Sequence, residues 1–380
     1  MGKQSVLRAS AGLTALAVAI AVFASSTDVG FAQAPPAPPA GIDQIDPDLG
    51  LGLVAWSEDR GAGHRIYGKR VRTNGMAVGG ASSGAFALTR ATGNGVDADS
   101  TGDQRFPALG GPGLVWSERV DDVTGYDLFA QRLHGNGLPS GPPRVLLSAP
   151  GDQLFPDVVA VANGYLLIYS EDTTDEGDVM GLRFTPSLVA RGAPFPIAQG
   201  EGAASDPTVA RDPAEPDRLI VHFTFLPKDA DNSDIYGVRL SETGVPIGGA
   251  RGGIFPVIAT PENEYAPRLV TGTFADAVRN SKSNASQNVF LFVRDDAADG
   301  SDVYAQRLRA NGFAYGAPFK VAGGLGTQSW PTATIIGDGG DDSEWLVAWA
   351  DDAQGTFDVL GLRLRFNGIP RGRGHVLVGD

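Results

Sequence analysis

The chain has 380 residues, of which 42% are hydrophobic, 52 are glycine and 26 are proline, and its formal net charge is -14. This composition supplies a hydrophobic core and many turns, which excludes disorder for the bulk of the chain. The negative charge argues against a nucleic-acid backbone or an anionic membrane surface as partner, because both attract basic surfaces. The absence of cysteine excludes disulfides, thiol catalysis and thiolate metal sites.

The N-terminus has the three parts of an export signal. Lys3 and Arg8 precede an apolar stretch over residues 11–24, and small residues follow it. The apolar stretch is shorter than the roughly 20 residues of a membrane-spanning helix. We therefore predict a signal peptide over residues 1–34, a Pro/Ala-rich spacer over 35–42 and a periplasmic or secreted bacterial protein without a membrane span after cleavage.

The rest of the chain repeats one sequence unit. Self-similarity at a regular spacing is typical of solenoids and propellers, and it decides the architecture before any local motif does. The most recognisable part of the unit occurs six times, as HRIYGKRV from His64, YDLFAQRL from Tyr126, GDVMGLRF from Gly177, SDIYGVRL from Ser233, SDVYAQRL from Ser301 and FDVLGLRL from Phe357.

Each unit contains four predicted strands. The first starts at a proline, where a missing N–H costs no ladder hydrogen bond; the second is an apolar run ending in an acidic pair, such as LVAWSED from Leu53. The third is the repeated core, and a turn such as Asn74-Gly75 leads into the fourth. We predict an all-β, six-bladed β-propeller of four-stranded antiparallel blades, each built from one continuous segment, with an open solenoid as the alternative. The expected blades cover approximately residues 43–90, 104–148, 153–199, 204–260, 264–322 and 328–380.

The third strand carries a small residue and an arginine in every unit. The pattern in blade 5 is Val303, Ala305 and Arg307 on one face, because side chains alternate along a strand. Gly or Ala at the middle position predicts that a large side chain lies against it, and we expect a tryptophan or tyrosine from the adjacent blade, such as Trp56. A residue repeated in all six units indicates a structural role, so we expect the arginines to pack and pair between blades.

This repeat, an apolar run with an aromatic residue and an acidic pair followed by Gly-x-Asp-Ile/Val-Tyr-Gly/Ala-x-Arg-Leu and Asn-Gly, resembles the propeller-like repeats of large exported bacterial proteins. Those repeats often lie beside adhesion or anchoring modules, so the resemblance implies architecture more than activity. The chain is also distantly similar to sialidase-type propellers: Ser57-x-Asp59-x-Gly61 matches the start of their Asp-box, but the closing aromatic residue is missing.

The connections between second and third strands are rich in carboxylates, and 21 of the 44 acidic residues fall in these six loops. One interpretation is Ca²⁺ binding, because closely spaced Asp and Asn oxygens near a glycine can surround a hard cation. The other interpretation is that Asp caps turns and the remaining charge is solvated. The candidate metal ligands are Asp229, Asp231, Asp234, Asp295, Asp296, Asp299 and Asp302.

The sequence favours a binding role over catalysis. The four histidines fall at unrelated repeat positions, and Asp157 and Arg268 are the only polar residues expected to face the central channel. We predict a monomeric, non-enzymatic protein that recognises a protein or carbohydrate ligand at the acidic loop face, with no certain cofactor. The alternative is a glycoside hydrolase or lyase with its site in the central channel, which would require two suitably spaced carboxylates.

Overall fold

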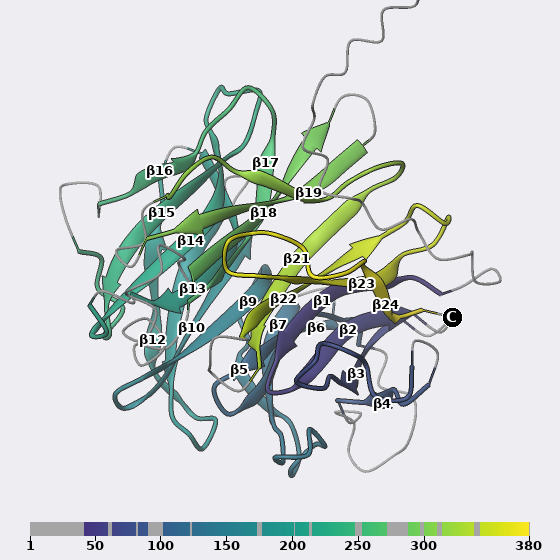
Figure 1. Ribbon diagram of the computed structural model, residues 1–380. Coiled ribbons are helices and arrows are strands. Elements are labelled where there is room, and N and C mark those ends of the chain that lie inside the picture. The colour runs from purple at the N-terminus through teal and green to yellow at the C-terminus, as the bar shows by residue number, and fades with distance from the viewer. Residues whose placement is uncertain are drawn as a thin grey trace, which may run out of the picture.

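The protein is a closed six-bladed β-propeller in the computed structural model (Figure 1). Six separate sheets contain four antiparallel strands each, and strands consecutive in sequence are neighbours in every sheet. The innermost strands contact one another in order around the axis, and the last of them, β21, contacts the first, β1. This ring confirms the predicted architecture and the continuous blades, and it excludes the open solenoid. The structure describes residues 42–59, 63–80, 83–89, 102–121, 124–172, 177–200, 202–212, 215–247, 253–271, 288–296, 300–309, 314–337 and 343–379.

Each blade runs outward from the axis in chain order. The strands of blades 1 to 3 are β1 (Gln44–Gly50), β2 (Leu53–Asp59), β3 (His64–Arg70), β4 (Phe86–Ala87), β5 (Gln104–Gly110), β6 (Gly113–Asp121), β7 (Gly125–Arg132), β8 (Arg144–Leu147), β9 (Asp152–Val161), β10 (Gly164–Asp172), β11 (Asp178–Phe184) and β12 (Ala190–Ala198). Those of blades 4 to 6 are β13 (Gly202–Arg211), β14 (Arg218–Pro227), β15 (Asp234–Ser241), β16 (Phe255–Ile258), β17 (Glu264–Val270), β18 (Asn288–Asp296), β19 (Gly300–Leu308), β20 (Phe319–Ala322), β21 (Gln328–Ile336), β22 (Glu344–Asp351), β23 (Asp358–Leu364) and β24 (His375–Val378).

The hydrophobic core lies between blades. Six clusters of buried apolar side chains each join two neighbouring blades, and Trp56 of blade 1, for example, packs in one cluster with Leu346 and Leu377 of blade 6. A single blade would leave both of its faces exposed, so the ring is the smallest unit that buries this apolar surface. The apolar second strands therefore read as continuous hydrophobic runs rather than as alternating ones.

The first acidic residue at the end of the second strand has a structural role in blades 1 and 2. The Trp56 indole N–H donates to Glu58 Oε2 at 2.8 Å, and the Trp116 N–H donates to Glu118 Oε2 at 3.0 Å. Residues two apart on a strand share a face, which brings each pair together. Glu58 and Glu118 are buried, so these carboxylates satisfy the tryptophan side chains instead of lining a metal loop.

A repeated polar contact joins consecutive blades on the face where the inner strands begin. At four of the six junctions, the residue before the repeated Gln or Glu of an inner strand accepts a backbone N–H at the start of the third strand of the preceding blade. Asp103 accepts from His64 N at 2.7 Å, and Asp152 accepts from Tyr126 N at 3.0 Å. The junction between blades 6 and 1 uses the same contact, because Asp43 Oδ1 accepts from Phe357 N at 2.9 Å. The ring closure thus uses the same contact as three of the other junctions.

Two expectations about the strands are wrong. The small residue of the third strand is covered by the fourth strand of its own blade, not by an aromatic residue of the adjacent blade: a Cβ on Gly68 would lie 2.6 Å from the Leu88 side chain. The proline of the first strand lies inside that strand rather than at its start, as Pro47 does in β1. The register shifts at every such proline, so a bulge leaves the proline outside the ladder.

The repeated arginine does contact the next blade in blades 1 and 2. Arg70 Nε donates to Asn136 O at 3.0 Å, and Arg132 donates to Pro186 O. The predicted signal peptide, and the spacer except for Ile42, lie outside the described residues. Among the described residues there is no helix with the length and apolar character that a membrane crossing requires.

Candidate functional site

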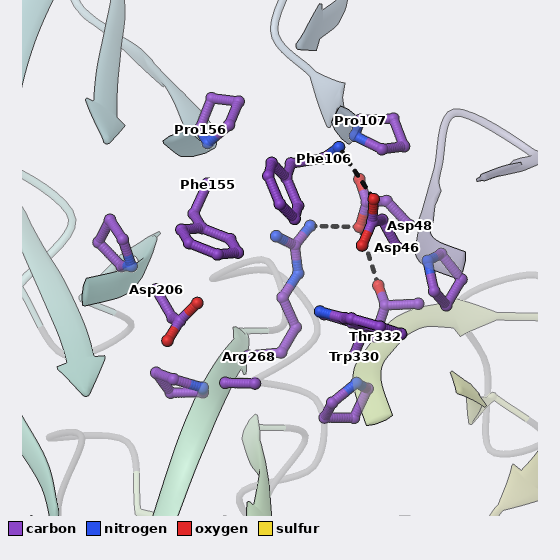
Figure 2. A pocket seen from close by; sticks show the side chains of 15 residues that line it. Asp46, Asp48, Phe106, Pro107, Phe155, Pro156, Asp206, Arg268, Trp330 and Thr332 are labelled. Carbon is purple, nitrogen blue, oxygen red and sulfur yellow. Dashed lines mark hydrogen bonds and ion pairs between the residues drawn. The ribbon is translucent and has the colours of Figure 1, made fainter. Parts of the chain in front are cut away.

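A pocket opens on the propeller axis, at the end where the inner strands begin (Figure 2). Its cavity volume is about 90 Å³, and the pocket is open to solvent at the mouth. All six blades contribute, each through the residues at its inner-strand proline. Gln44, at the start of β1, pairs with Glu58, near the end of β2. The inner strands therefore begin on the face that carries the acidic loops, and the pocket is the mouth of the channel on that face.

The bulge at each proline aims one side chain at the axis. The residue before the proline has a positive φ in every blade, between 47° and 54°. A non-glycine residue in this left-handed region is uncommon, and such residues are concentrated at functional sites. The six residues are Asp46, Phe106, Phe155, Asp206, Ala266 and Trp330. The backbone conformation is the same in all six blades, but the side chains differ. The repeated bulge therefore positions six different side chains around one site.

Three aromatic side chains form part of the pocket wall. The rings of Phe106 and Phe155 have centroids 4.2 Å apart, and Arg105 lies over the Phe106 ring at 4.7 Å. Trp330 lies further around the mouth and packs edge-on against Phe357, with centroids 5.7 Å apart. All three aromatic residues are only partly buried, so part of each side chain is exposed at the mouth.

The two wall carboxylates, Asp46 and Asp206, belong to blades 1 and 4 and have different surroundings. Asp46 accepts two hydrogen bonds from the Arg105 guanidinium, at 2.6 and 3.2 Å, which holds it as an ion pair. Asp206 accepts from Ser205 Oγ at 2.9 Å, and within the described chain no cationic side chain lies at ion-pair distance from it. Burial raises the pKa of Asp206, although hydrogen bonds from the hydroxyls of Ser205 and Thr224 oppose the shift.

The residues that follow the six prolines form a second ring beneath the first, which we call the floor, and three of them, Asp48, Arg268 and Thr332, line the pocket. Four of them accept the N–H of the next blade: Asp48 from Leu109 N at 2.6 Å, Asp157 from Val209 N at 2.9 Å, Thr208 from Leu269 N at 3.1 Å and Thr332 from Leu49 N at 3.2 Å. The other two members are Ala108 and Arg268, which offer no side-chain acceptor. They belong to blades 2 and 5, on opposite sides of the ring.

Arg268 spans the floor. Its guanidinium lies 2.6 Å from Asp48 and 3.3 Å from Asp157, the floor residues of blades 1 and 3. Those blades flank blade 2, whose residue at this level is Ala108. Figure 2 shows the Arg268 side chain reaching toward Asp48. Burial raises the pKa of Asp48, and the charge of Arg268 opposes that shift. The channel is therefore closed at this level by one cation shared between two carboxylates.

The sequence identified Asp157 and Arg268 correctly as polar residues at the channel, but the expectation that they were the only ones is wrong. Asp48, Thr208 and Thr332 belong to the same ring, and Asp46 and Asp206 lie one layer above it. The sequence did contain a signal for Asp46 and Asp206, because both directly precede the proline that aligns in all six repeats.

The candidate metal ligands are not brought together among the described residues. Asp302 pairs with Lys320, Asp295 accepts from Asn263 Nδ2 at 2.8 Å, and Asp234 accepts from Asn232 Nδ2 at 3.3 Å. Within the described ranges no group of three or more His, Asp or Glu side chains could hold an ion, and Asp299 lies outside those ranges. For these residues calcium binding and turn capping both stay predictions.

Comparisons with known proteins identify the architecture. No protein-family model and no curated protein matches the sequence. Among solved structures, an α-L-arabinofuranosidase from Fusarium graminearum, a mutant in complex with an iminosugar inhibitor, is similar with a TM-score of 0.56 at 13% identity, over 90% of this chain and 98% of that chain. An endo-arabinase from Bacteroides thetaiotaomicron has a TM-score of 0.44 at 10% identity, over 73% and 98%. The chain thus has a propeller fold distantly similar to glycoside hydrolase propellers, without a family assignment.

Proposed function

We propose that the protein binds a carbohydrate in the pocket at the channel mouth. The observation that carries the proposal is the set of side chains at one repeated backbone position. Three aromatic residues and two carboxylates from five different blades meet at the axis, although the backbone is the same in each.

The chemistry of the pocket suits a sugar ring. A sugar presents apolar C–H faces and hydroxyl edges, and a site for it combines aromatic surfaces with a few fixed polar groups. Phe106, Phe155 and Trp330 supply the surfaces, and Asp206 supplies carboxyl oxygens with no competing cation among the described residues. The Fusarium graminearum neighbour, named as an arabinofuranosidase with an iminosugar bound, supports the idea that a propeller of this build accommodates a sugar-like ligand.

Binding is tested by titration of the purified chain with arabinan and xylan oligosaccharides, followed by tryptophan fluorescence and calorimetry. We expect saturable binding, and Trp330→Ala and Phe155→Ala weaken it at least about tenfold through lost ring contact. The matched control is Leu325→Ala, which removes a side chain that is 80% exposed on the same face. Failure of a broad set of oligosaccharides to bind, or unchanged affinity in both aromatic variants, would contradict the proposal.

A second candidate function is hydrolysis of a glycosidic bond, and the different surroundings of Asp46 and Asp206 favour it. Glycoside hydrolysis needs one carboxyl group that keeps its proton and one that is ionised. We assign Asp206 as the acid that protonates the leaving oxygen. Asp46 then takes a proton from the water that attacks the anomeric carbon, so water is divided between the two products.

Hydrolysis is measured by release of nitrophenol from aryl arabinosides and xylosides. Asp206→Asn is expected to lower kcat at least about 100-fold while oligosaccharide affinity changes little, because the amide keeps the shape and the acceptor. Binding without turnover in the unaltered chain would leave the carbohydrate-binding proposal and remove the hydrolytic one.

A further inference from the structure

The face opposite the channel mouth has a charge that the net charge of the chain conceals. We call it the hairpin face, because the first-to-second and third-to-fourth connections of every antiparallel blade emerge there. Ten exposed arginines lie in or beside the third-to-fourth connections, namely Arg70, Arg72, Arg132, Arg144, Arg183, Arg191, Arg309, Arg365, Arg371 and Arg373. Blades 1, 2, 3, 5 and 6 contribute these arginines, and the repeated Arg at the end of the third strand is among them in blades 1, 2 and 3.

Acidic residues are few on the hairpin face and concentrate in blade 4. Within the described ranges they are Asp212, Glu215, Asp217 and Glu242 of blade 4 and Glu344 of blade 6. Three of the blade 4 carboxylates are in ion pairs with arginines of the same blade, such as Arg218–Glu215 at 2.8 Å. In the part of the chain that the structure describes, the rest of the hairpin face is therefore basic, apart from Glu344, which pairs with Arg363 and Arg371, and the acidic loops lie at the opposite end.

The hairpin face also exposes aliphatic side chains. Of the eleven exposed large hydrophobic residues in the described chain, seven lie in its connections: Leu51, Met76, Val78, Leu138, Val189, Val245 and Ile369. Met76, Leu138 and Ile369 directly follow the Asn-Gly turns. The repeat thus places an apolar tip beside an arginine at successive points around the rim.

The two features are closest together at the junction of blades 6 and 1. The hairpins of these blades are in contact, because His375 Nε2 lies 3.1 Å from Gly75 O. Around this contact lies what we call the 6–1 patch, formed by the exposed residues Arg72, Met76, Arg365, Ile369 and Arg373.

We propose that the hairpin face binds the surface of a bilayer that contains anionic lipids. Arginines pair with headgroup phosphates, and short apolar tips enter the boundary between headgroups and acyl chains. A soluble polyanion would use the charge but not the aliphatic tips, so the combination favours a lipid surface. This inference does not depend on the carbohydrate proposal, which concerns the other face.

The net charge does not oppose this contact. The blade strands of seven to ten residues separate the two faces by roughly 20–30 Å at about 3.3 Å per residue. Screening at physiological salt acts over about 8 Å, so the acidic loops lie beyond the reach of the bilayer charge. On this proposal the net charge of the chain does not predict which surfaces it binds, because the charges are segregated.

The test is co-sedimentation of the purified chain with vesicles of equal parts phosphatidylglycerol and phosphatidylcholine, against vesicles of phosphatidylcholine alone. We expect sedimentation with the anionic vesicles only, weakened by added salt. Arg72→Glu/Arg365→Glu/Arg373→Glu lowers the partition coefficient at least about tenfold, and the Arg→Lys version of the same three positions retains most of it. These three side chains lie at the surface, and thermal melts check that each variant folds.

The apolar contribution has its own pair of variants. Met76→Ser/Ile369→Ser lowers partition several-fold, whereas Leu325→Ser, on the channel-mouth face, leaves it unchanged. The proposal is overturned if the unaltered chain stays in the supernatant with anionic vesicles, or if charge reversal has no effect. Binding to a sulfated polysaccharide without binding to vesicles would likewise overturn it and assign the face to a soluble polyanion.

Discussion

Two rings of side chains lie one above the other on the propeller axis, and they come from residues only two positions apart in each blade. The floor ring after the prolines is buried and closed by hydrogen bonds between blades, with Arg268 across it. The wall ring before the prolines is partly exposed except at Asp46, which is buried, and its members differ in size, charge and polarity. The comparison teaches that the same six strands stabilise the ring at one level and present a ligand site at the next. Substitutions in the floor should therefore change stability, and substitutions in the wall should change binding.

The largest expected effect is that of Arg268→Met. The substitution leaves Asp48 and Asp157 buried without their shared cation, and breaking a buried ion pair in this way costs about 3–5 kcal/mol. Urea unfolding measures the loss. Arg268→Lys, which keeps one charge, should lose less, and a Met variant within about 1 kcal/mol of the parent would show that the bridge does not stabilise the ring.

A matched pair of alanines separates the two rings directly. Ala108→Leu places a larger side chain in the buried floor, where Arg268 crosses, and should destabilise the fold by about 1–3 kcal/mol. Ala266→Leu makes the same change in the open wall and should cost less than about 1 kcal/mol while reducing the space for a ligand. Equal losses of unfolding free energy in the two variants would contradict the division between floor and wall.

Asp206→Asn should change how stability depends on pH. The pKa of Asp206 in the folded state is above its ordinary value of 3.8, so the folded protein holds this proton longer than the unfolded chain does. Its contribution to the unfolding free energy consequently falls as pH rises from about 4 through the folded-state pKa. We expect the Asn variant to match the parent at lower pH and to be more stable at neutral pH. Urea unfolding across this range measures the difference, and a parallel dependence in both proteins would rule out the shift.

The smallest expected effect concerns calcium. The described aspartates of the acidic loops already contact Lys320, Asn263 and Asn232, so we expect millimolar Ca²⁺ after EDTA to leave Tm unchanged. Binding to the native state alone would raise Tm. A clear rise in Tm would show that the acidic loops bind Ca²⁺. The loops would then be a third functional region beside the two rings.

The sequence predicted the ring better than the site. Repetition revealed the six blades, the order of strands and the Asn-Gly turns, because each is a local pattern that recurs. The bulge at Pro47 and its equivalents was not predicted, because a proline signals only that its N–H is outside the ladder, either at a strand start or at a bulge. Asp46 and Asp206 were missed for the same reason, since only the bulge directs them to the axis.

The role of the carboxylates was also beyond local sequence. Glu58 lies in an acidic run that resembles a solvated loop, yet it is buried against the Trp56 indole of its own strand. Asp103 of blade 2 contacts the start of the third strand of blade 1, a partner 39 positions away in the chain. Such contacts depend on how neighbouring blades are set against each other, which spacing within one repeat does not specify.

The left-handed backbone before each proline also limits what the pocket can become. β-branched residues are the least tolerated in this conformation, whereas Asp, Asn and Gly are the most tolerated. None of the six wall residues is Val, Ile or Thr. Changes to this mouth, in nature or in the laboratory, would therefore use a restricted set of residue types, rich in carboxylates, amides and aromatic rings. Each wall residue could be exchanged in one blade at a time without changing the rest of the propeller.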